Sequence, residues 1–140
     1  MIPIDESRLL RVLTERYSQV VELDEHQAHA LCHAIQFYLR RLIVQMSYQP
    51  LYYEEAQCIR PLERVMVRLQ KLLLLEWSSG KRKRPRLRKL RLEYDALLQL
   101  NRLLRDEELW AAEQHQEGCL NAAYLKINQK AHNLHPPFAL

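Results

Sequence analysis

The chain has only two glycines and six prolines among its 140 residues. These two residue types interrupt helices most often, and the signals of β-strands are almost absent as well. Leucine, glutamine, arginine, glutamate and alanine dominate instead, and their side chains lose little conformational freedom in a helix. The composition therefore predicts an all-α protein.

Long apolar runs are also lacking, since unbroken apolar stretches reach only four residues, as at Leu72–Leu75. A membrane-spanning helix needs about 20. Residues 1–6 have neither a basic nor an apolar region, so we expect no signal peptide. Cys32, Cys58 and Cys119 form an odd, widely spaced set that is typical of reduced, partly buried thiols. We therefore expect a cytoplasmic protein without membrane insertion.

Apolar residues make up 48% of the chain, and 140 residues are enough to build one hydrophobic core. We expect a single domain over residues 1–140. Apolar residues recur at helical spacing, which predicts an antiparallel helical bundle of four to five helices. The expected helices run from 5 to 22, from a cap at Asp24 to before Pro50, from about 51 to a stop at 78–80, from 86 or 87 to a stop at Gly118, and from 119 to 133.

Two places in this scheme have specific local signals. Asp24 is an N-cap residue, and Gln27 three positions later completes a capping box. Pro61 lies inside the third helix, so we expect that helix to be kinked or divided there. A short apolar tail, residues 135–140, either folds back onto the body or docks on another subunit.

Positive charge is concentrated in residues 81–91. Eight of these eleven residues are cationic and none is acidic, whereas the whole chain carries +4, so the rest of the chain carries −4. Because clustered like charges repel one another, selection for stability alone does not favour this segment. It predicts a polyanion-binding site, and a solvated inter-helix loop and a nuclear-import signal are the alternatives. The cations are Lys81, Arg82, Lys83, Arg84, Arg86, Arg88, Lys89 and Arg91.

A row of cations extends this segment along the third helix. Its members step by four, four and three residues, which places them on one helical face. Four residues rise about 6 Å, so the row has the reach to contact several phosphates of one strand. The row is Arg60, Arg64, Arg68 and Lys71. A similar row on the fourth helix starts with Arg88 and Arg91 and continues with Arg102 and Arg105. Ordinary arginines on solvated faces are the alternative, favoured by nearby Glu63, Glu76, Glu93 and Asp95.

Three tyrosines surround Pro50, namely Tyr48, Tyr52 and Tyr53. Exposed tyrosines stack on nucleic-acid bases, whereas buried ones pack at a helix junction, and the sequence leaves both interpretations open. Because no zinc-finger, leucine-zipper or RNA-binding sheet motif is present, we expect recognition of the backbone rather than of base sequence.

His26, His29 and His33 share one face of the second helix. A pair of histidines four residues apart supplies two metal ligands, but no pattern on another helix completes a site. We therefore interpret them as polar surface residues and expect neither a metal nor a cofactor. The serines lie in no catalytic motif, and the adjacent acids Asp106, Glu107 and Glu108 splay around a helix. We expect no enzymatic activity, with a cryptic metal-dependent one left open.

The sequence thus predicts a non-enzymatic nucleic-acid-binding bundle, a small subunit of a larger nucleoprotein assembly, with other subunits or further copies as partners. The alternative is an adaptor or assembly factor whose basic loop meets an acidic partner or an anionic surface. In architecture alone, the expected bundle is similar to the small subunits of CRISPR effectors and to retroelement accessory proteins. DNA versus RNA, and single versus double strand, stay open.

Overall fold

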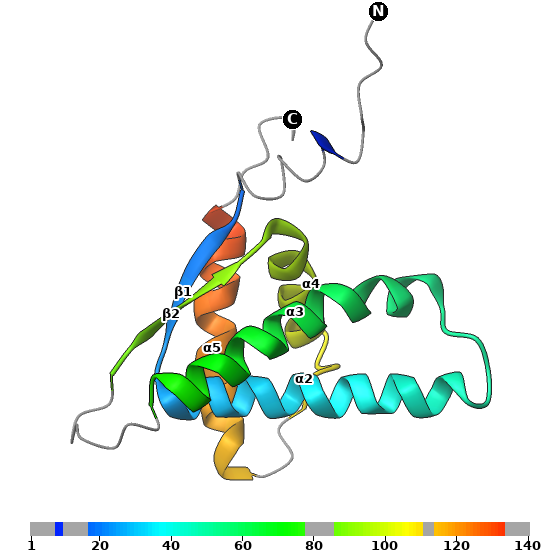
Figure 1. The fold of residues 1–140 in the computed structure, drawn as a ribbon, viewed down its shortest axis with the longest axis horizontal. Helices are drawn as coiled ribbons and strands as arrows, with labels where there is room; N and C mark the ends of the chain where they lie inside the picture. The colour runs from blue at the N-terminus through cyan, green and yellow to red at the C-terminus, as the bar shows by residue number, and fades with distance from the viewer. Residues whose placement is uncertain (1–7, 10–16, 78–85, 111–113, 134–140) are drawn as a thin grey trace, which may run out of the picture.

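The computed structural model describes residues 8–9, 17–77, 86–110 and 114–133. The predicted all-α class is confirmed, with a short two-stranded sheet added to the helices. The elements are β1 (Gln19–Leu23), α2 (Glu25–Met46), α3 (Tyr53–Leu75), β2 (Arg88–Leu92), α4 (Tyr94–Arg105) and α5 (Gln114–Asn133). Figure 1 shows α2 and α3 as an antiparallel hairpin, with α5 crossing α2 and the sheet beside them.

The central element is the first half of α2, which packs against α3 and α5. Ala28, Leu31 and Ile35 are buried there, and the small residues Ala30 and Ala34 are buried beside them. Small side chains on several sides let neighbouring helices approach closely. The predicted capping box is confirmed: Asp24 Oδ1 accepts from the Gln27 backbone N–H over 2.7 Å, and Gln27 Oε1 accepts from the Asp24 N–H over 3.2 Å.

The second half of α2 differs from the first. Together with the first turns of α3 it extends past α4 and α5, as Figure 1 shows. Large apolar side chains at this end of the hairpin are exposed, among them Phe37, Ile43, Val44 and Met46. The hairpin therefore has a covered end and an uncovered end.

The two segments that form the sheet were both predicted to be helical, and both predictions were wrong. Residues 19–23 form β1 instead of the end of a first helix, and residues 88–92 form β2 instead of the start of the fourth. The strands pair antiparallel, with Val21 opposite Leu90 on the buried side and Glu22 opposite Lys89 on the exposed side. Alternating burial and opposite charges across the pair stabilise strands over the weak local helical preference. The two strands are far apart in the sequence, so a local sequence pattern does not show that they pair.

Pro61 does not divide α3, so the alternative of a two-part third helix was wrong. The helix runs from Tyr53 to Leu75 with Pro61 buried inside it. Proline removes one helical hydrogen bond. The buried seam of Cys58, Leu62, Val65 and Leu69 runs past that point and holds both halves of the helix against the core.

The fourth helix ends earlier than predicted, at Arg105. The Glu108 N–H donates to the Leu103 carbonyl over 2.8 Å and the Glu107 N–H to the Leu104 carbonyl over 3.3 Å. Glu107 has φ 56°, so the chain closes in a Schellman motif with a non-glycine residue in the left-handed region. Acidic residues at a helix C-terminus also oppose the helix dipole, which favours the stop.

Gly118 was predicted to end a helix and instead lies inside α5, which begins at Gln114 rather than at 119. Burial of Leu120, Ala123 and Ile127 on the core side of α5 outweighs the low helical propensity of one glycine. Parts of the predictions lie outside the described residues: residues 5–7 and 10–16 of the first helix, the stop at 78–80, residues 81–85 of the basic segment and the tail at 135–140. No helix in the described part of the chain is long and apolar enough to span a membrane.

Candidate nucleic-acid interface

The predicted cation row on α3 lies in one open groove. Arg60, Arg64, Arg68 and Lys71 all line it, and its volume is about 880 Å³. Gln57, Pro61, Glu63 and Val67 complete its α3 wall, and Asp95 of α4 forms part of its edge. The helical spacing thus places four cations along about 16 Å of one concave surface. We call this surface the α3 groove.

Two of these cations are held by carboxylates of the segment after β2. Arg68 Nη2 pairs with Glu93 Oε1, and Arg64 Nη1 lies 3.3 Å from Glu93 Oε2. Arg64 Nη2 also donates to Asp95 Oδ2. Glu93 is the residue just before α4, and its side chain is only 16% exposed. The pairs fasten α4 to α3 and lower the positive charge available in the middle of the groove.

The two ends of the row differ from its middle. Arg60 and Lys71 are exposed, and neither forms an ion pair within the described residues. Lys71 lies toward the end of α3 from which the chain leads to the basic segment. Arg60 and Lys71 are therefore the groove cations that can bind a phosphate without first breaking an ion pair with a carboxylate.

The end of α3 is joined to the start of β2. The Trp77 Nε1–H donates to the Arg86 carbonyl over 2.9 Å, and Arg88 Nη2 lies 3.2 Å from Glu76 Oε2. Farther along, Arg68 Nη1 donates to the Arg91 carbonyl over 2.8 Å. Strand β2 thus lies beside the second half of α3, in contact with Arg68.

The cations of residues 81–91 differ in exposure and in the contacts that they make. Lys81, Arg82, Lys83 and Arg84 lie outside the described residues. Arg88 is half-buried and paired with Glu76, whereas Arg86, Lys89 and Arg91 are exposed. The prediction that Arg86, Arg88 and Lys89 begin a helix was wrong, because they precede or belong to β2. A strand alternates its side chains, which leaves Lys89 and Arg91 on the exposed face.

The second predicted row does not form as one helical face, since Arg88 and Arg91 lie on β2. Arg102 and Arg105 do lie on α4 but have other contacts. Arg102 Nη2 donates to Cys58 Sγ over 3.1 Å and to Gln99 Oε1 over 3.0 Å, and Arg105 pairs with Asp106. The sequence pattern could not separate these arginines from those of α3, because their partners come from other elements or from the turn after α4.

The tyrosines near Pro50 do not pack at a helix junction. Tyr48, Tyr52 and Tyr53 are 85%, 74% and 77% exposed. Tyr53 lies seven positions before Arg60, which is two helical turns, so it shares the face of the α3 row. An exposed aromatic ring therefore stands at one end of the α3 groove, in line with its cations.

The histidines His26, His29 and His33 are exposed, as predicted. The rings of His29 and His33 are 5.4 Å apart at 74°, and His33 Nδ1 lies 3.4 Å from Gln116 Nε2. No group of three metal-binding side chains occurs among residues 8–9, 17–77, 86–110 and 114–133.

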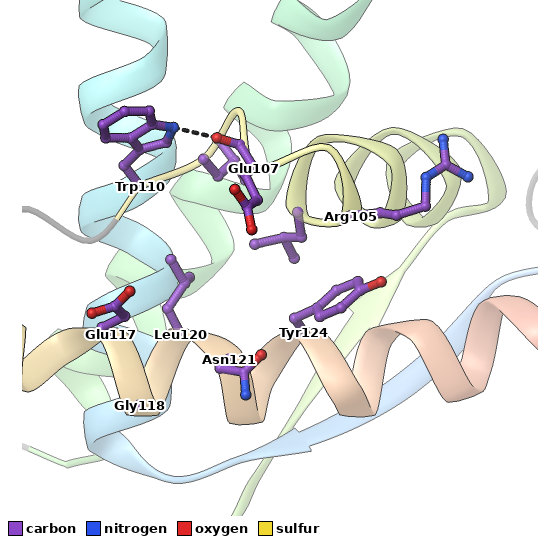
Figure 2. A pocket seen from close by; sticks show the side chains of 10 residues that line it. Arg105, Glu107, Trp110, Glu117, Gly118, Leu120, Asn121 and Tyr124 are labelled. Carbon is purple, nitrogen blue, oxygen red and sulfur yellow. Dashed lines mark hydrogen bonds between the residues drawn. The ribbon is translucent and has the colours of Figure 1, made fainter.

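A second cavity lies between the end of α4 and the first half of α5, with a volume of about 750 Å³. Figure 2 shows Trp110 above it, with its indole N–H on the Glu107 carbonyl, and Leu120 and Tyr124 rising from α5. No pattern in the sequence predicts this cavity. Its exposed Trp110 follows the turn at which α4 ends, sooner than the sequence predicts. Its described lining residues include no histidine, serine or cysteine.

The described cysteines are structural in character. Cys32 and Cys58 are buried and Cys119 is half-buried, and all three are free thiols. Burial raises the pKa of the Cys58 thiol, and the neighbouring Arg102 guanidinium lowers it by less. A thiol with a raised pKa is a poor nucleophile at neutral pH.

No protein-family model, curated protein or solved structure matches this chain.

Proposed function

We propose that the chain is a non-enzymatic protein that binds the phosphate backbone of nucleic acid through the α3 groove and the basic segment 81–91. The observation that carries the proposal is the placement of Arg60, Arg64, Arg68 and Lys71 in one groove. Phosphate contacts by arginine and lysine supply most of the affinity of binding that does not depend on sequence. The protein then acts as a small subunit of a nucleoprotein assembly.

The groove favours a single strand over a duplex. An exposed aromatic side chain in line with a row of cations is the arrangement that single-strand-binding proteins use, because bases stack on the ring while phosphates follow the cations. Tyr53 and the α3 groove supply these two parts. Bases in a duplex are already stacked on one another and are not available to the ring.

The ion pairs of Arg64 and Arg68 set a condition on binding. Glu93 and Asp95 form ion pairs with these arginines in the free protein. A phosphate therefore has to displace the carboxylates or bind the arginines alongside them. Arg60 and Lys71 carry no such cost. We therefore expect moderate affinity that falls steeply with salt.

Fluorescence anisotropy with labelled single- and double-stranded oligonucleotides tests the proposal. The wild type is compared with a variant in which glutamine replaces six cations of the basic segment, namely Lys81, Arg82, Lys83, Arg84, Arg86 and Lys89. Arg88 is retained because its pair with Glu76 is structural. We expect salt-sensitive binding by the wild type, tighter for single strands, and a large loss in the variant. No binding by the wild type at low salt would overturn the proposal.

A second candidate function, protein–protein assembly, is favoured by a separate observation. The uncovered end of the α2–α3 hairpin exposes Phe37, Ile43, Val44 and Met46, each by more than half. Several exposed large apolar side chains at one end of a hairpin mark an interaction site in many proteins.

A further inference from the structure

An apolar groove runs between α2 and α3 on a face next to the α3 groove. Its volume is about 320 Å³. Leu39, Leu42 and Ile43 line it from α2, and Ile59 and Met66 line it from α3. Ile43 is 64% exposed. We call this surface the hairpin groove.

The pattern of α2 indicates that another chain covers this surface. Ile43 lines the hairpin groove, whereas Phe37 and Val44 lie about a third of a turn away around the same helix, by their helical spacing. The second half of α2 is thus apolar on several sides. Exposed Arg40 and Arg41 interrupt this apolar surface, but exposed apolar side chains in this number mark an interaction surface.

The charges at the hairpin groove show what kind of chain fits it. Arg40 lines the groove from α2 and Glu63 lines it from α3. Both are exposed, and neither forms an ion pair within the described residues. Each lies between the first and last lining residues of its own helix, Arg40 between Gln36 and Ile43 and Glu63 between Ile59 and Met66. The surface therefore carries one positive and one negative edge around an apolar centre.

Such a surface is complementary to itself. A two-fold axis parallel to the helices and above the groove places α2 of one copy over α3 of the other. Arg40 of each copy then meets Glu63 of its neighbour, and the apolar side chains meet in the centre. We propose that two copies of the chain associate in this way into a four-helix bundle.

The arrangement also explains why the hairpin groove differs from the α3 groove. Among the described residues, the α3 groove is lined by four cations and by only two carboxylates, Glu63 and Asp95, so its net charge is positive and would repel a second copy. The hairpin groove has balanced charge and an apolar centre, which disfavours nucleic acid and favours a like surface. Glu63 lines both grooves, but the inference does not depend on nucleic-acid binding, because its test measures the association of two copies in the absence of nucleic acid.

Sedimentation equilibrium of the full chain over a range of concentrations tests the inference. We expect the wild type to be a dimer. Arg40→Glu places like charges against each other, and so does Glu63→Arg, so each should raise the dimer dissociation constant about tenfold or more. The double variant Arg40→Glu/Glu63→Arg exchanges the two charges and should return the constant to near the wild-type value. Circular dichroism melting shows that each variant is folded.

A matched pair of apolar changes gives a second readout. Ile43→Ser should weaken the dimer, whereas Leu125→Ser should not, because Leu125 is exposed to a similar degree (58%) but lies on α5. A wild type that stays monomeric throughout, or a double charge exchange that fails to restore association, would overturn the inference. So would a dimer unaffected by Arg40→Glu, which would place the contact on another surface.

Discussion

Trp77 donates its indole N–H to the backbone carbonyl of Arg86 over 2.9 Å. The two residues stand at the end of α3 and just before β2, and the Arg88–Glu76 ion pair adds a second link beside them. The cations of α3 and of β2 are therefore held next to each other. These contacts hold Arg86 and Arg88 beside the end of α3 that carries Lys71.

Glu93→Gln should change stability and binding in opposite directions. Glu93 pairs with Arg64 and Arg68 and is mostly buried, so its loss should lower the free energy of unfolding by about 1–2 kcal/mol. The same change removes the carboxylate that pairs with Arg68 and one of the two that pair with Arg64, so it should tighten nucleic-acid binding severalfold. Urea denaturation and anisotropy measure the two effects.

The control for this change is Glu117→Gln, an exposed position on α5 outside the α3 groove. It alters the net charge by the same amount. It should leave stability within about 0.5 kcal/mol of the wild type and affinity nearly unchanged. Equal effects of the two variants on binding would show that net charge, rather than release of the arginines, controls affinity.

Stability should fall at alkaline pH because of Tyr38. Burial raises the pKa of Tyr38 to about 12 from its ordinary value of 10. The unfolded state therefore loses the phenol proton first, so the stabilisation is complete below pH 10 and is lost as pH rises toward 12. The loss amounts to about 2–3 kcal/mol at the upper end.

Urea denaturation between pH 8 and pH 12 checks this dependence. Tyr38→Phe removes the phenol and should flatten the profile, although not completely, because burial also raises the pKa of the Cys32 and Cys58 thiols. An identical slope for the wild type and Tyr38→Phe would contradict the assignment to Tyr38.

Glu107→Gly should stabilise the protein. Glu107 has φ 56°, a region that costs an L-residue about 1 kcal/mol and costs glycine little. The Schellman bonds and the Trp110 contact use only the backbone of Glu107, so glycine preserves them. We expect a gain of about 0.5–1 kcal/mol in thermal denaturation. A loss of stability would show that the Glu107 side chain contributes more than its backbone strain costs.

The parts of the fold that local patterns determine were predictable, and those that depend on distant partners were not. The cap at Asp24 depends on two residues that are three positions apart, and the sequence predicted it correctly. The spacing of Leu87, Leu90, Tyr94 and Leu97 imitates a helix, although Leu90 in fact pairs with Val21 of β1. A strand pair between segments so far apart in sequence leaves only a short alternating pattern in each.

The same division holds for the candidate site. Helical spacing alone placed Arg60, Arg64, Arg68 and Lys71 on one face, and the structure places them in one groove. The pairing of Arg68 with Glu93 could not be derived, because it depends on how α4 follows β2. The exposure of Tyr53 was also undetermined, since it requires knowing which elements cover the hairpin.

The most direct test of the central claim uses the two unpaired groove cations. Arg60→Gln/Lys71→Gln is compared with Arg105→Gln/Lys130→Gln, which removes the same charge from α4 and α5, and binding to a single-stranded oligonucleotide is measured across a salt series. Each lost phosphate contact reduces the slope of log affinity against log salt by about 0.7, so the groove variant should lose about 1.4 and the control close to zero. Equal slopes for the wild type and the groove variant would contradict binding through the α3 groove.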